Sequence, residues 1–168
     1  AMLSAGPIVL TESTQVKARA FGSAWSAVHE AVFAVGPVAE GLRISEIMYH
    51  PADTGNPDDP NTEYIELTIV GTESIRLKLV RFTDGIDFTF PGIDLLPGAC
   101  CLVVKDTAAF EARYGPGLPI VGEYNGLLAN NGERITLVDA IGVMIQSLRY
   151  EDDWYNATDG QGYSLTSV

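Results

Sequence analysis

Apolar and polar residues alternate in short runs along most of the chain, a pattern typical of half-buried β-strands. The pattern is organised around one acidic loop. In residues 42–50, apolar side chains occur on both faces of the expected strand, which predicts a strand lying between two layers. Residues 63–67 alternate between apolar and polar side chains, which predicts a strand with one face exposed to solvent. Prolines, a glycine, asparagines and aspartates fill residues 51–62, so no strand can run through that stretch.

The rest of the chain continues in the same manner. Asp84-Gly85 predicts a tight hairpin turn. One helix is expected over residues 107–115, because Asp106 or Thr107 can cap it and Gly115 ends it. Further strands are predicted at residues 75–80, 87–90, 100–105, 127–128, 135–137, 143–150 and 163–168. Counting from residue 42, about nine short strands and one short helix predict an all-β sandwich.

The first part of the chain predicts a small β-strand extension. Short strands are expected at residues 8–10, 15–21 and 31–35, and glycine and proline then mark a linker at residues 37–41. We therefore divide the chain into residues 1–36, the linker and a sandwich over 42–168. Three strands alone leave an apolar face uncovered, so we expect them to dock onto the sandwich or to form a homodimer with a second copy of the chain.

The sandwich region resembles the bacterial lamin tail domain, an immunoglobulin-like fold. Six stretches in order carry the resemblance, namely residues 44–51, 63–67, 81–91, 96–106, 128–150 and 154–165. At one place the chain departs from the family, because Lys78, Leu79 and Val80 stand where members carry a small residue, glycine and tryptophan. The resemblance implies an immunoglobulin-like β-sandwich of about nine strands.

The first thirty-six residues resemble the C-terminal part of a fibronectin-III-like module of the kind attached to chitobiases. The stretches at residues 7–14 and 16–21 and the pair Trp25-Ser26 carry this resemblance. Together the two resemblances imply a non-catalytic interaction or spacer module of a larger secreted or cell-surface bacterial protein, with a signal sequence upstream. The implied partner is another protein or a cell-surface component.

Charge and cysteine content narrow the function classes. The chain of 168 residues has a net charge of −12, and its ten lysines and arginines are scattered, which argues against nucleic-acid binding and against an anionic membrane surface. A run of about 18 apolar residues is lacking, so we expect no direct membrane insertion. The adjacent Cys100 and Cys101 point to opposite faces of a strand and are expected to be unpaired, packed thiols.

Catalytic patterns are missing from the sequence. It contains no G-x-S-x-G, P-loop, dinucleotide-binding or H-E-x-x-H motif, and neither His29 nor His50 stands near a serine or cysteine in a recognised arrangement. Glu63 and Glu66 fall on opposite faces of one strand, so they do not form a carboxylate pair. We therefore predict a protein that is not an enzyme and needs no organic cofactor.

Calcium binding is the sharpest alternative. The acidic loop supplies hard oxygen ligands from Asp53, Asp58, Asp59, Asn61 and Glu63, with Asn56 among them, and a second acidic cluster lies at Glu151, Asp152, Asp153 and Asp159. Neither matches a spaced calcium-loop pattern, and Asp-Pro and Asn-Pro steps are also ordinary turn formers. A calcium-stiffened spacer and a plain turn-rich loop both remain open.

The tryptophans each allow two interpretations, ligand contact and packing over the core. Trp154 and Tyr155 could contact a carbohydrate or a peptide, which would suit a carbohydrate-binding accessory domain of a secreted hydrolase. Alternatively, Trp154 covers the end of the core before the closing strand, and Trp25 has the same two interpretations.

Overall fold

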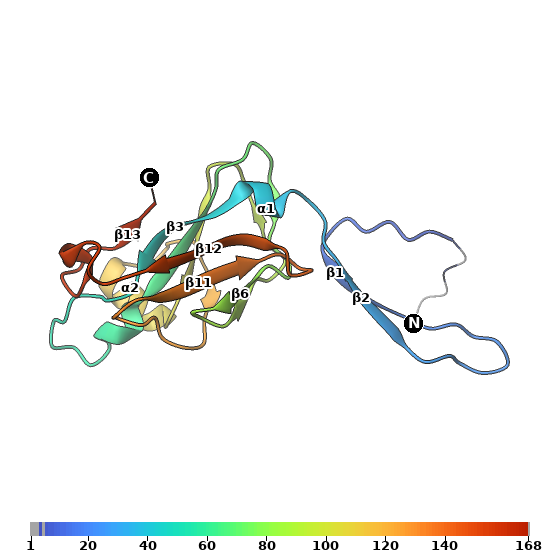
Figure 1. The fold of residues 1–168 in the computed structure, drawn as a ribbon, viewed down its shortest axis with the longest axis horizontal. Helices are drawn as coiled ribbons and strands as arrows, with labels where there is room; N and C mark the ends of the chain where they lie inside the picture. Colours follow the sequence, from blue (N-terminus) through green and yellow to red (C-terminus); the bar gives the residue numbers. More distant parts are fainter. Residues whose placement is uncertain (1–3, 5, 168) are drawn as a thin grey trace.

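Two stacked sheets form the body of the molecule, as the all-β prediction required. The computed structural model describes Ser4 and residues 6–167. One sheet has five strands in the order β10-β9-β4-β3-β13, and the other has four in the order β12-β11-β6-β7 (Figure 1). The five-stranded sheet consists of β3 (Leu42–Met48), β4 (Tyr64–Ile69), β9 (Cys100–Val104), β10 (Ile120–Glu123) and β13 (Leu165–Thr166).

The second sheet, a short ribbon and the helical segments complete this sandwich. The four-stranded sheet consists of β6 (Arg81–Asp84), β7 (Phe88–Thr89), β11 (Glu133–Val138) and β12 (Met144–Tyr150). A two-stranded ribbon pairs β5 (Ile75–Arg76) with β8 (Asp94–Leu95). The helical segments are α1 (Val38–Gly41), α2 (Thr107–Tyr114) and the 3-10 turns η1 (Asp59–Thr62) and η2 (Asn156–Thr158). None of the helices among the described residues is long and apolar enough to cross a bilayer.

The core lies between the two sheets. In β4, Ile65, Leu67 and Ile69 point into it while the alternate residues stay half-buried, which confirms the predicted alternation. Ile135 and Leu137 of β11 meet them from the opposite sheet. Each fully buried aliphatic side chain contributes about 1.5–3 kcal/mol to stability, so this interlayer cluster is the main source of stability in the body.

A bulge explains why β3 is apolar at both parities. The register between β3 and β4 shifts between Ile44 and Glu46, so the residues facing the core change parity there. Leu42 and Ile44 enter the core before the shift, and Ile47 enters it afterwards. The strand lies between β4 and β13, as predicted for an inner strand, but the bulge, rather than two covering layers, accounts for its pattern.

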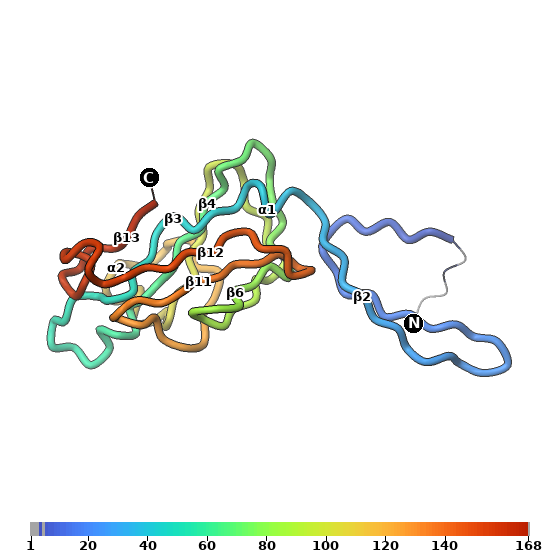
Figure 2. The backbone as a smooth tube through the Cα atoms, viewed as in Figure 1, coloured from blue at the N-terminus to red at the C-terminus, as the bar shows by residue number. Residues whose placement is uncertain are grey.

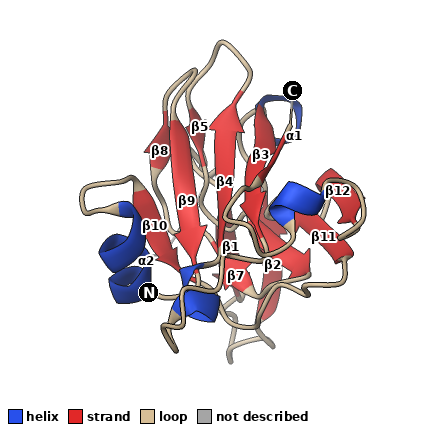
Figure 3. Cartoon of the chain, turned by 90° about the vertical axis from the view of Figure 1, so that its left-hand side faces the viewer, coloured by secondary structure: helices blue, strands red, loops and turns tan. Residues whose placement is uncertain are grey.

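Helix α2 covers the outer face of the five-stranded sheet beside β10 (Figure 3). The predicted cap is confirmed, because the Asp106 carboxylate accepts a hydrogen bond of 2.8 Å from the Ala109 N–H. Phe110 packs with Leu102 and Val104 of β9 in a second, smaller cluster. Cys101 meanwhile faces the core, so β9 is buried on both sides, and both cysteines are free as predicted.

The N-terminal region differs from the prediction. It forms two strands, β1 (Thr14–Ala18) and β2 (His29–Phe33), and residues 8–10 form none. The tube of Figure 2 shows this hairpin projecting away from the body, which it joins through α1. β1 and β2 do not stack on the sandwich, although Thr14 at the base of β1 contacts Lys78 of the body at 3.4 Å, so docking and homodimer formation both stay predictions. The boundaries of 1–36, 37–41 and 42–168 stay predictions, and α1 occupies the expected linker.

Several other strand predictions were wrong in detail. The strand expected at 75–80 ends at Arg76, because the chain turns with Leu79 at a positive φ of 66°. Residues 127–128 form no strand, whereas β10 was not predicted at all. From residue 42 onward the described chain has eleven strands, four of them only two residues long, where about nine were expected. The predicted hairpin between β6 and β7 is confirmed, with Gly85 at a φ of 84°, but its turn is not tight, because five residues lie between the paired Phe82 and Phe88.

Candidate functional site

The acidic loop between β3 and β4 is organised around Asp59. This buried carboxylate accepts hydrogen bonds from the Thr54 N–H at 2.6 Å and the Asn56 N–H at 3.2 Å, and it pairs with Arg113 of α2 at 3.0 Å. The hydrogen bond from the Thr54 backbone is the largest cause that holds the pKa of Asp59 below its usual value. The charge of Asp59 therefore already has protein partners.

Glu63 belongs to a different environment. Its side chain is only 3% exposed, and its Oε2 accepts hydrogen bonds from the Tyr124 hydroxyl at 2.9 Å and the Leu128 N–H at 3.0 Å. Burial raises the pKa of Glu63 to about 7, although these two hydrogen bonds oppose the rise. Glu63 thus tethers the irregular segment after β10 to the start of β4.

The remaining calcium candidates lie on the loop surface. Asp53 accepts a hydrogen bond of 2.8 Å from the Gly55 N–H, and the Asn61 amide donates to Asp58 at 3.3 Å. Among Ser4 and residues 6–167, no three histidine, cysteine or acidic side chains converge in a way that could hold a metal ion. Glu63, Asp53 and Asp59 line one pocket of about 290 Å³, but each carboxylate already accepts hydrogen bonds from the protein, and calcium binding stays a prediction.

In the second acidic cluster, Glu151 and Asp159 contact different basic side chains. Asp159 contacts His50 Nδ1 at 2.5 Å, and Glu151 contacts Arg149 at 2.5 Å. The pair between His50 and Asp159 helps to hold the turn after β12 against the loop after β3. In the described part of the chain, no hydrogen bond joins either histidine to a serine or cysteine.

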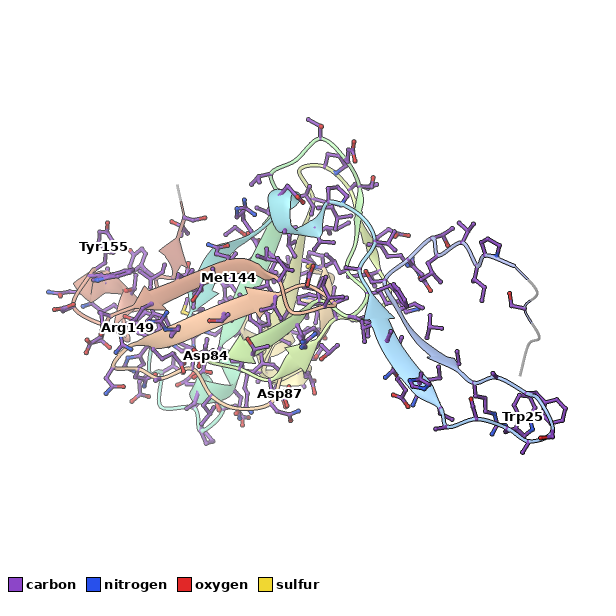
Figure 4. All side chains as sticks on the ribbon, turned by 45° about the vertical axis from the view of Figure 1, so that its right-hand side comes forward. Trp25, Asp84, Asp87, Met144, Arg149 and Tyr155 are labelled. Atoms are coloured by element: carbon purple, nitrogen blue, oxygen red, sulfur yellow. The ribbon has the colours of Figure 1, made fainter. Side chains whose placement is uncertain are left out.

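Trp154 and Tyr155 stand on that same turn, and both are exposed, by 53% and 67% respectively. The interpretation of Trp154 as a cover for the core is therefore wrong, and Trp25, exposed by 49%, does not cover the core either. Figure 4 shows Tyr155 and Trp25 at opposite ends of the molecule. The turn is anchored beneath by a contact of 3.1 Å between the hydroxyls of Tyr49 and Thr158.

The two aromatic residues line a pocket of about 280 Å³, here called the aromatic pocket. It lies where β12, the edge strand of one sheet, comes close to β3 and to β13, the edge strand of the other. The other lining residues are Ile44, Ser45, Glu46, Ile47, Leu148, Tyr150, Leu165, Thr166 and Ser167. The Gln146 side chain joins the sheets near this pocket by accepting a hydrogen bond of 2.8 Å from the Ile44 N–H.

The shape of the aromatic pocket offers a surface for an extended or flat ligand. The pocket has a mostly apolar lining with several hydroxyl groups at its border, and its one lining carboxylate, Glu46, accepts hydrogen bonds from Tyr64 and Ser164. Sequence reasoning identified the aromatic pair but missed the wall formed by β3, β12 and β13. Only the pairing of the sheets brings these strands together.

Comparisons with protein-family models, with curated proteins and with solved structures found no match to this chain. The resemblances to the lamin tail domain and to a fibronectin-III-like module therefore stay predictions.

Proposed function

We propose that this chain is a non-catalytic interaction module of a larger secreted or cell-surface bacterial protein, and that it binds another protein or a surface component. The observation that carries the proposal is the exposure of Trp154 and Tyr155 at a pocket between two sheet edges. Aromatic side chains give large contact area at low entropic cost, and such residues dominate binding energy at protein interfaces.

The edge strands favour an extended polypeptide as the ligand. β12 is seven residues long and has a neighbour on one side only, so part of its backbone can pair with an added strand. The edge of β3 near the pocket is already occupied, because the Ile44 N–H donates to the Gln146 side chain and the Ser167 N–H donates to the Ser45 carbonyl. A peptide paired with β12 would place alternate side chains against the aromatic pocket.

A matched pair of variants tests this proposal. Tyr155 lines the pocket and Tyr163 does not, yet their exposures of 67% and 66% are nearly equal. A displayed library of unstructured peptides should yield binders whose affinity falls about tenfold or more in Tyr155→Ala and is unchanged in Tyr163→Ala. A library without binders, or an equal loss in both variants, would contradict the proposal.

Carbohydrate binding is the second candidate, because the pocket combines an aromatic pair with the hydroxyls of Ser45, Thr166 and Ser167. A glycan array separates the two. A signal on glycans that vanishes in Trp154→Ala, without peptide binders, would favour an accessory domain of a hydrolase over a protein-binding module. The calcium-stiffened spacer is tested by thermal melting below.

A further inference from the structure

The two exposed aromatic rings of the aromatic pocket differ from Trp25 in what covers them. The Arg19 guanidinium lies 4.3 Å from the ring centroid of Trp25, and the Phe21 ring lies 4.7 Å from it. Trp154 and Tyr155 make no aromatic pair and no cation–π contact with any described residue. The quadrupole of such a ring attracts a positive charge over its face. These two rings can therefore receive a cation from a ligand.

The turn that carries these rings is acidic. Residues 150–168 contain no lysine or arginine and hold a third of the net charge of −12, in the side chains of Glu151, Asp152, Asp153 and Asp159. Glu151 and Asp159 contact Arg149 and His50, whereas Asp152 and Asp153 make no ion pair or hydrogen bond through their side chains with the described residues. Two unpaired carboxylates thus directly precede Trp154.

Basic side chains do not offset this charge at the pocket. The described residues that line it include no lysine or arginine. Arg149 and Arg43, on the strands beside it, are held elsewhere, because Arg149 pairs with Glu151 and Arg43 donates to two backbone carbonyls. Consecutive Cα atoms lie about 3.8 Å apart, so Asp152 and Asp153 act on the pocket within about one Debye length, roughly 8 Å, at physiological salt. The pocket therefore combines apolar walls with a negative potential.

We propose that the aromatic pocket binds a cationic segment of another protein, in which a lysine or arginine side chain lies over the ring of Trp154 beside Asp152 and Asp153. This inference rests on the proposed peptide binding, which it deepens by naming the chemistry of the partner. A second copy of this chain does not fit, because two bodies with the same large negative charge repel each other. An extended segment with a basic residue at every second position suits the site, since alternate side chains of a strand share a face.

Three short peptides test the charge of the ligand. They alternate threonine with lysine, with acetyl-lysine or with glutamate, and acetylation removes the charge of the lysine side chain while keeping its length. In isothermal titration calorimetry with the full chain, the lysine peptide should bind about tenfold or more tightly than the acetylated peptide, and the glutamate peptide should not bind. The advantage of the lysine peptide should shrink as sodium chloride rises from about 50 to about 500 mM.

Two matched double variants separate the pocket from the general charge of the body. Asp152→Asn with Asp153→Asn removes the unpaired charges beside the pocket. Asp84→Asn with Asp87→Asn removes two exposed charges from the hairpin of β6 and β7, whose β7 edge lies opposite β12 in the sheet, and Figure 4 shows both residues apart from Tyr155. The two double variants have the same net charge. The first should weaken binding of the lysine peptide about tenfold, and the second should leave it unchanged.

Substitutions of Trp154 give a readout for the ring itself. Leucine keeps an apolar surface but has no ring quadrupole, so Trp154→Leu should lose most of the preference for lysine over acetyl-lysine, whereas Trp154→Phe should keep part of it. An unchanged preference in Trp154→Leu would overturn the proposal.

Other outcomes overturn it as well. They are equal binding of the lysine and acetyl-lysine peptides, equal losses in the two double variants, and no binding by any of the three peptides. Peptide binding as such survives each of these results if the displayed library still yields binders that depend on Tyr155. A library without binders contradicts the proposed function itself, so the two failures are distinguishable.

Discussion

Replacing Glu63 by glutamine should change how the stability of the body depends on pH. The carboxyl group is buried at the start of β4 and accepts hydrogen bonds from Tyr124 and Leu128. Glutamine has nearly the same shape, and its amide oxygen can accept the same two bonds. The substitution therefore removes the titration of this side chain while keeping the tether.

The magnitude follows from the pKa of Glu63, which burial raises from 4.5 to about 7. Because the folded state holds the proton more tightly, the stabilisation by Glu63 is full below pH 4.5 and is lost as the pH rises towards 7. Each pKa unit corresponds to about 1.36 kcal/mol, and we expect about 2–3 kcal/mol in total after solvent screening at this site.

Urea unfolding of both proteins between pH 4.5 and 8 measures this effect. The difference in unfolding free energy between the variant and the wild type should shift by about 2–3 kcal/mol in favour of Glu63→Gln as the pH rises. Other titrating groups cancel in this difference. Circular dichroism suits the measurement better than tryptophan fluorescence, because Trp25 and Trp154 are already exposed in the folded state. A difference that is flat across this range, or that moves in the opposite direction, would refute the reasoning.

Three further predictions concern stability. Leu79 has a φ of 66°, a left-handed conformation that strains any residue with a Cβ atom, so Leu79→Gly should be about 1 kcal/mol more stable than Leu79→Ala in urea unfolding. An alanine variant at least as stable as the glycine variant would contradict this backbone strain. Arg113→Ala removes the ionic partner of Asp59 and should lower the unfolding free energy, and Asp59→Asn should restore part of the loss. Additive losses in the double variant would argue against coupling of the two side chains. If the acidic loop binds calcium, millimolar calcium raises the melting temperature relative to chelator and Asp58→Asn removes the shift, whereas identical melting curves would argue against a site.

The alternation of apolar and polar residues predicted the strands that bury one face or both faces in the sandwich. The alternation over β4 and the apolar run of β9 both lie where the sequence indicated, because each strand has neighbours on both sides in a packed sheet. β10 was missed, since four residues carry too little periodicity. It pairs in parallel with β9 after α2, and a buried strand followed by a helix is the signal that could have indicated it.

The candidate site was only partly predictable for the same reason. Trp154 and Tyr155 are conspicuous in the sequence, but their exposure depends on how the turn after β12 is held by Tyr49 and His50, more than one hundred residues earlier. The raised pKa of Glu63 likewise depends on a segment that reaches it from beyond α2. Local patterns specify which face of a strand is apolar, and the long-range contacts decide what covers it.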